Sequence, residues 1–176
     1  MNQAGKQLDV SFQPCRSSLS QSATGMSYRD FLERRFGTQA VIHQSLVAAE
    51  MRKLGIEPAF SKIVTLPDVL PALAAVLWLQ RSGKSAQQFI ESVFAALYSH
   101  GQDIGDVAVM KKLLSREMAS FNDFHEFMLS DTFSEELLDT EAKVASWAGR
   151  VIPSFRIKDT VVFGAQTPGV LAPMLI

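Results

Sequence analysis

The sequence predicts an α/β fold in which one strand, a long series of helices, a β-hairpin and a last helix follow one another. Three observations predict it. Apolar and polar residues alternate with a period of two over residues 8–13. Apolar residues then recur at helical spacing over residues 27–149. After Gly149 the period shortens again, over two stretches that are short enough to be the strands of a hairpin.

The first elements have clear limits. The alternation over residues 8–13 ends at Pro14, and the Ser- and Gln-rich residues 15–25 are a predicted loop. Ser27 begins a helix, with Asp30 where a capping carboxylate belongs, and Gly37 ends it. A second helix is predicted over about residues 39–54, with one apolar face. This face consists of Val41, Ile42, Leu46, Val47 and Met51.

The central part of the chain is helical and strongly apolar. Residues 68–82 are apolar on most sides, which predicts a central, mostly buried helix. The next helix begins at Ser85 and ends near His100. It carries Phe89, Val93, Phe94, Leu97 and Tyr98. Three shorter helices are predicted over about residues 106–116, 121–129 and 134–149, with Thr132 and Glu135 as a capping pair for the last.

The C-terminal part changes back to strands. Residues 154–157 and 160–163 are predicted strands, and the Lys-Asp pair between them is a predicted turn. Thr167 is the predicted cap of a last helix, with Pro168 at its first position.

The composition fits one globular domain and excludes several classes of partner. The chain has 176 residues, of which 47% are hydrophobic and 20% charged, and its net charge is -1. This charge gives no reason to expect a nucleic-acid partner. The longest apolar run, residues 69–79, is too short to cross a bilayer, and residues 1–10 contain no apolar core of a signal peptide. We therefore expect a cytoplasmic protein that does not bind membranes.

Several short motifs resemble those of the DsbA/FrnE class of thioredoxin-fold proteins. They occur in the order of that family over residues 8–176. The motifs are Val10-Ser11-Phe12-Gln13-Pro14, Tyr28-x-x-Phe31-Leu32-x-x-Arg35-Phe36-Gly37, the Gly101-Gln102-Asp103-Ile104-Gly105-Asp106 turn after an aromatic-rich helix, Ile152-Pro153-Ser154-Phe155 and Gly164-Ala165-Gln166. The family is related to 2-hydroxychromene-2-carboxylate isomerase and to kappa-class glutathione transferases.

The resemblance implies a domain organisation and a binding site. The whole chain, 1–176, would be one DsbA-like domain, with residues 7–14 and 150–176 as its thioredoxin-like part and 26–149 as a large helical insertion. In such folds the proline equivalent to Pro153 is cis, and the backbone beside it can bind an extended peptide or a thiol substrate. Ile152, Pro153 and Ser154 are therefore the implied substrate-binding residues.

The family's first strand and its active-site helix, with the Cys-x-x-Cys turn, have no counterpart in this sequence. Cys15 is the single cysteine, and dithiol exchange needs two thiols. We interpret Cys15 as a small half-buried residue; a monothiol role is the alternative and makes Cys15 the weak catalytic candidate. The central helix also departs from the family, because Asp68 and Leu73 stand where an Asn and a His are usual.

The remaining polar and aromatic candidates have structural interpretations. His100, Asp103 and Asp106 could suggest a metal site, but the aspartates suit helix capping and we expect no metal. We expect His43 and His125 on exposed helix surfaces. Trp78 and Trp147 are expected in the core.

The sequence leaves three functions open. The leading one is a DsbA-family protein, redox-inactive alone, that binds a peptide or protein partner. The second is a glutathione-dependent isomerase or transferase that uses Ser17, Ser18 or Cys15 near Pro153. We expect no cofactor, although the resemblance admits glutathione. The third is an oxidoreductase whose Cys-x-x-Cys segment lies upstream.

The missing central strand has a consequence for partners. Without it, residues 8–13 lack a neighbour and the 154–157 strand has an open edge. The two could pair directly, a second copy could complete the sheet, or a separate polypeptide could supply the strand. We expect a homodimer.

Overall fold

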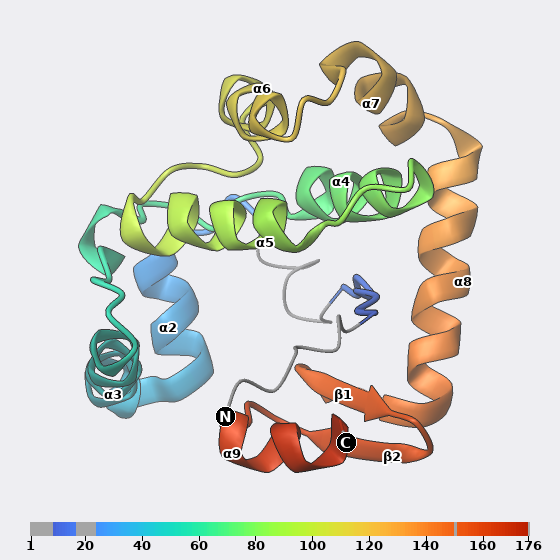
Figure 1. The fold of residues 1–176 in the computed structure, drawn as a ribbon. Helices are drawn as coiled ribbons and strands as arrows, with labels where there is room; N and C mark the ends of the chain where they lie inside the picture. The colour runs from blue at the N-terminus through green and yellow to red at the C-terminus, as the bar shows by residue number, and fades with distance from the viewer. Residues whose placement is uncertain (1–8, 17–23, 150, 176) are drawn as a thin grey trace.

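The computed structural model describes residues 9–16, 24–149 and 151–175, which form a mostly helical body with one small sheet (Figure 1). The α-helices are α2 (Tyr28–Phe36), α3 (Ala40–Lys53), α4 (Leu70–Arg81), α5 (Gln87–Phe94), α6 (Val107–Arg116), α7 (Phe121–Met128), α8 (Asp131–Ala148) and α9 (Pro168–Leu171). Shorter helical turns are η1 (Gly37–Gln39), η2 (Phe60–Lys62), the π-helix η3 (Ala95–Ser99) and η4 (Ala172–Leu175). The strands are β1 (Ser154–Ile157) and β2 (Thr160–Phe163).

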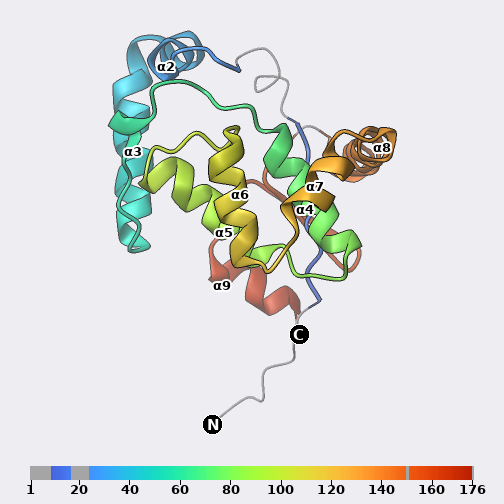
Figure 2. The ribbon, with the colours of Figure 1, turned by 90° about the horizontal axis from the view of Figure 1, so that it is seen from above.

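The helices are arranged around α4 and α5. Helices α6 and α7 lie above them, and α8 descends along one side to β1, β2 and α9 (Figure 1). Helices α2 and α3 lie on the side opposite α8, as the view from above also shows (Figure 2). Within the described residues, the α/β prediction is thus confirmed only in part, because the sheet there contains β1 and β2 alone.

Helix α4 is the centre of the core, as its sequence predicts. Its residues are buried on most sides, and Ala74, Ala75 and Leu79 have no exposed surface. The two alanines let α5, α6, α7 and α8 pack closely around it. Trp78 packs edge-on against Phe124 of α7, which confirms its predicted place at the core.

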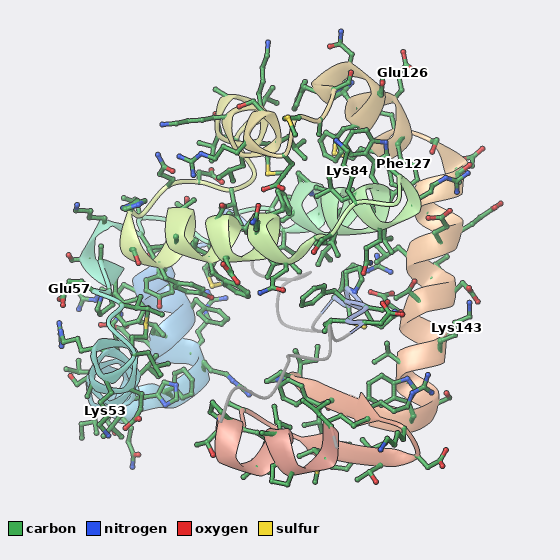
Figure 3. The ribbon with its side chains drawn as sticks, in the orientation of Figure 1. Lys53, Glu57, Lys84, Glu126, Phe127 and Lys143 are labelled. Carbon is green, nitrogen blue, oxygen red and sulfur yellow. The ribbon has the colours of Figure 1, made fainter. Side chains whose placement is uncertain are left out.

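Two labelled side chains show how neighbouring elements join the core (Figure 3). The ring of Phe127 on α7 packs against that of Phe133 on α8, with ring centroids 5.8 Å apart. Lys84, between α4 and α5, donates from Nζ to the carbonyl oxygens of Glu117 and Met118, at 3.0 and 2.9 Å. Lys84 therefore satisfies carbonyls at the C-terminal end of α6.

Hydroxyl or carboxylate side chains cap the starts of α2, α6, α7 and α8. Ser27 accepts from the Asp30 amide at the start of α2, and Asp106 accepts from two amides at the start of α6. The predicted start of α8 is wrong. Ser130 caps it, so the helix begins earlier and Thr132 and Glu135 lie inside it.

The predicted strand over residues 8–13 is also corrected. Residue 8 lies outside the described residues, and residues 9–13 form no strand. A strand needs a neighbour, and the neighbour here is a side chain: the amide of Gln80 on α4 bonds both backbone groups of Phe12. The segment is therefore held by helices rather than by a sheet.

Helix α3 forms where predicted, but its apolar face is not buried by the described residues. Val41, Ile42 and Leu46 are 74%, 60% and 63% exposed. Only Ala40 and Ala48 of this helix are buried. Helical periodicity identifies an apolar face, but whether the chain covers that face depends on the tertiary structure.

The C-terminal hairpin matches its predicted limits, and Pro168 begins α9 as predicted, although the Thr167 side chain makes no capping bond. No residue of 151–175 is buried, in contrast to the core around α4. Among the described residues, no helix is long and apolar enough to span a bilayer.

Candidate functional site

The segment before β1 contains the predicted site residues Ile152, Pro153 and Ser154. The Ile152–Pro153 peptide bond is cis, as the resemblance implied. Gly164 donates to the Pro153 carbonyl at 2.8 Å, and the Ser154 hydroxyl donates to the Val151 carbonyl at 2.6 Å. Pro153 and Ser154 are thus held by hydrogen bonds, while Ile152 is 55% exposed.

The register of the hairpin shows which backbone groups of β1 point away from β2. Ile157 and Thr160 flank the two-residue turn, so they form a hydrogen-bonded pair. Bonded pairs then alternate along the hairpin, at Phe155 with Val162 and at Pro153 with Gly164. The N–H and C=O groups of Ser154 and Arg156 therefore point away from β2, toward the other edge of β1.

No described residue occupies that edge. The strand β1 pairs with β2 alone, and no backbone or side-chain group in the described ranges hydrogen-bonds to the outward N–H and C=O groups of Ser154 and Arg156. A row of unsatisfied donors and acceptors on an exposed edge is a template for another extended chain.

The side chain of Arg156 contacts α8 rather than another strand. Its guanidinium lies over the ring of Trp147 on α8, 5.3 Å from the ring centroid. This contact links β1 to α8 and is a favourable cation–π geometry. Trp147 is half-buried beneath Arg156 and is not part of the main core, which corrects the prediction that placed it there.

Cys15 lies in a different environment, in the segment between α4 and α8. Its thiol is half-buried and donates weakly to the Gln13 carbonyl, at 3.7 Å. Burial, followed by the nearby negative charge of Glu141, raises the pKa of Cys15. The thiolate form, which is the nucleophile, is thereby disfavoured, so Cys15 fits the interpretation as a structural residue.

Glu141 of α8 anchors the same segment. Arg16 donates to it from the backbone N–H and from the guanidinium Nε, both at 2.8 Å, and from a terminal guanidinium nitrogen at 2.6 Å. Both side chains are about three-quarters buried. The guanidinium and the N–H together form a fork around the carboxylate, which is a strong and directional arrangement.

Comparison of the sequence with models of protein families identifies the family. The model of the DSBA-like thioredoxin domain matches residues 17–175. The chain belongs to this family. A search of curated proteins found no match. The suspected DsbA/FrnE resemblance is therefore confirmed at the level of the family, and this DSBA-like chain has a single cysteine and no Cys-x-x-Cys pair.

The positions that depart from the family pattern have structural roles in this DSBA-like chain. The Asp68 carboxylate accepts from the Leu70 amide at the start of α4, and Leu73 packs against the core. Ser17 and Ser18, which the glutathione alternative requires, lie outside the described residues.

The aspartates considered for a metal site, and the histidines His43 and His125, make local contacts. Asp103 and Asp106 bond backbone amides at the turn before α6, in agreement with the capping interpretation. His43 is exposed and stacks on Phe36. His125 is half-buried against Phe121, so its predicted exposure is wrong. Within 9–16, 24–149 and 151–175, no group of His, Cys, Asp and Glu side chains could hold a metal ion.

Sequence reasoning missed Gln80 and Glu141, which position the segment 9–16. Gln80 had a recognisable signal, because it is a polar residue near the end of an otherwise apolar helix. Glu141 had none, since it is one of several acidic residues on α8 and its partner Arg16 is far away in the sequence.

Proposed function

We propose that this DSBA-like chain is redox-inactive on its own and acts by binding an extended segment of a peptide or protein along the free edge of β1. The observation that carries the proposal is the outward direction of the Ser154 and Arg156 backbone groups beside Pro153. Addition of a strand to such an edge gives affinity through main-chain hydrogen bonds.

The exposure of the C-terminal part supports a protein-sized partner. None of residues 151–175 is buried, although many of them are apolar. Val151, Ile152, Phe163 and Val170 each expose two fifths or more of their surface. Apolar side chains gathered on one unit favour coverage by another chain, and burial of this surface would add to the edge hydrogen bonds.

The chemistry of the single thiol supports a binding role rather than catalysis. Thiol–disulfide exchange on a substrate needs one thiolate to attack and a second thiol to resolve the mixed disulfide. Cys15 is the one cysteine of this chain, and the pKa of its thiol is raised. An insulin-reduction assay should therefore give no turnover above the uncatalysed rate.

The partner that completes the edge can be a second copy of the chain. A homodimer of this kind stays a prediction, which sedimentation over a range of protein concentrations tests. If the edge of β1 forms the dimer, blocking that edge should give a monomer.

The decisive experiment blocks the edge without breaking the hairpin. Proline at position 156 removes one outward N–H, and it is tolerated where the N–H faces away from the sheet. Val161→Pro is the matched control, because Val161 lies opposite Arg156 and its N–H points away from β1. Arg156→Ala separates the effect of the guanidinium from that of the backbone.

The readout is the fluorescence anisotropy of a labelled heptapeptide in which Thr and Val alternate between terminal lysines. Arg156→Pro should weaken binding about fivefold, the loss expected for one net hydrogen bond, and Val161→Pro by less than about twofold. Equal affinities for the two proline variants, with both folded by circular dichroism, would contradict an edge on β1.

A further inference from the structure

A surface cavity lies between η3 and α6, on the far side of the core from β1. Its volume is about 160 Å³. Ala95 and Ala96 of η3 and Leu113 of α6 line it with small or apolar groups, while Ser92 and Gln102 contribute a hydroxyl and an amide. The cavity therefore has an apolar wall and polar groups that can donate hydrogen bonds.

The backbone around this cavity is fixed by close packing. After η3 the chain turns at Gly101, which has a φ of +67°. A Cβ atom at this position would lie 2.3 Å from the Cβ of Lys62, so only glycine fits. The turn holds His100 and Gln102 on either side of Gly101 at the rim of the cavity.

The rim is positively charged. Lys112 and Arg116 lie one helical turn apart on α6, and His100 comes from the end of η3. No Asp or Glu side chain is among the residues that line the cavity. In the described part of the chain, the side chains of these three residues form no ion pair and no hydrogen bond.

Three acidic residues close in sequence to the lining residues accept hydrogen bonds from other groups. Asp106 accepts from the amides of Ala108 and Val109, and Asp103 accepts from the Gly105 amide. Glu91 accepts from the side chain of Gln87. The charges of Lys112 and Arg116 are thus left for a ligand or for solvent.

We propose that this cavity binds a phosphate group. Lysine and arginine side chains one turn apart can hold an oxyanion with charge-assisted hydrogen bonds, and arginine adds a planar fork that suits phosphate. The volume is that of about five water molecules, which gives room for a phosphate group and for part of an attached ester. The cavity and the β1 edge share no residue, so this proposal goes beyond the proposed function.

The neighbouring lysine provides a matched control. Lys111 and Lys112 are adjacent, exposed residues of α6, but only Lys112 lines the cavity. Lys111→Gln and Lys112→Gln therefore remove the same charge from the same helix. Because both lysines are exposed, both variants are expected to fold, and circular dichroism checks this.

Titration of the whole protein with inorganic phosphate, at constant ionic strength set with chloride, tests the proposal by amide chemical shifts. Residues 92–102 and 109–116 should shift together and saturate. Lys112→Gln and Arg116→Gln should each weaken phosphate binding about tenfold, the effect of one charge-assisted hydrogen bond. Lys111→Gln should change it by less than about twofold.

A parallel titration with glycerol phosphate distinguishes free phosphate from a phosphate ester as the natural source. Tighter binding of the ester assigns the site to an organic phosphate, and equal binding assigns it to the anion alone. Absence of saturable shifts at about 10 mM of both compounds, or equal weakening by Lys111→Gln and Lys112→Gln, would overturn the proposal.

Discussion

The side chain of Gln80 forms two hydrogen bonds with the backbone of Phe12. The Phe12 N–H donates to Gln80 Oε1 at 2.8 Å, and Gln80 Nε2 donates to the Phe12 carbonyl at 2.9 Å. A neighbouring strand would satisfy the same two groups of one residue in the same way. A helix side chain thus takes the place of a strand residue and fixes the segment 9–16 against α4.

Replacement of Gln80 by leucine should release this segment. The change leaves the partly buried N–H and C=O of Phe12 without partners, so we expect a loss of about 1–2 kcal/mol in the free energy of unfolding. Gln88→Leu, at an exposed position of α5 whose side chain forms no hydrogen bond with the described residues, should cost less than about 0.5 kcal/mol. Urea unfolding measures both, and equal losses would show that the Gln80 pair contributes nothing.

The Arg16–Glu141 pair should make stability depend on pH. Hydrogen bonds from Arg16 hold the pKa of Glu141 below its ordinary value of 4.5. A carboxyl with a lowered pKa in the folded state stabilises that state above the unfolded pKa, and this contribution is lost as the pH falls through the folded pKa.

Glu141→Gln should therefore destabilise the protein by about 1 kcal/mol at neutral pH. It should also remove part of the loss of stability that the parent chain shows below pH 4.5. The control is Asp139→Asn, which breaks the exposed pair of Asp139 with Lys143 on α8 and should cost less than about 0.5 kcal/mol. Lys143 is labelled in Figure 3. Urea unfolding at several pH values measures both. Identical pH profiles for Glu141→Gln and the parent chain would contradict the account.

Cys15 should react slowly with alkylating reagents. Burial raises the pKa of this thiol, and the charge of Glu141 raises it further, so the fraction of thiolate at neutral pH is small. The pH profile of iodoacetamide alkylation should have a midpoint above the ordinary value of 9.0, and Glu141→Gln should move it down. A midpoint below 9.0 in the native protein would instead favour a reactive monothiol.

Two phenylalanines of α5 provide a test of the core. Phe89 has no exposed surface, whereas Phe94 is 56% exposed and stacks on Tyr98. Phe89→Ala should cost about 3–5 kcal/mol, and Phe94→Ala about 1 kcal/mol or less. If Phe89→Ala does not fold, Phe89→Leu should still be less stable than Phe94→Ala in thermal unfolding. The reverse order would show that α5 is oriented differently.

Local patterns predicted the elements well, because they depend on neighbouring residues. The hairpin follows from two short stretches with strand patterns on either side of the Lys158-Asp159 turn, and α2 follows from Ser27, Asp30 and Gly37. The cis bond at Pro153 followed from the family resemblance rather than from any local pattern.

Relationships between distant residues could not be predicted in this way. The apolar face of α3 suggested a buried helix, yet periodicity does not reveal whether any part of the chain covers Ile42 and Leu46. The alternation over residues 8–13 predicted a strand, but its partner turned out to be the side chain of Gln80. Similarly, the pair of Arg16 and Glu141 joins residues 125 positions apart.

Amide hydrogen exchange along β1 tests the central claim most directly. The amides of Phe155 and Ile157 point to β2 and should be protected in the free protein at low concentration, whereas those of Ser154 and Arg156 should exchange close to their intrinsic rates. Addition of the Thr–Val heptapeptide should then protect Ser154 and Arg156. Protection of these two amides before any peptide is added to the monomer, or no change on its addition, would contradict a free, strand-accepting edge.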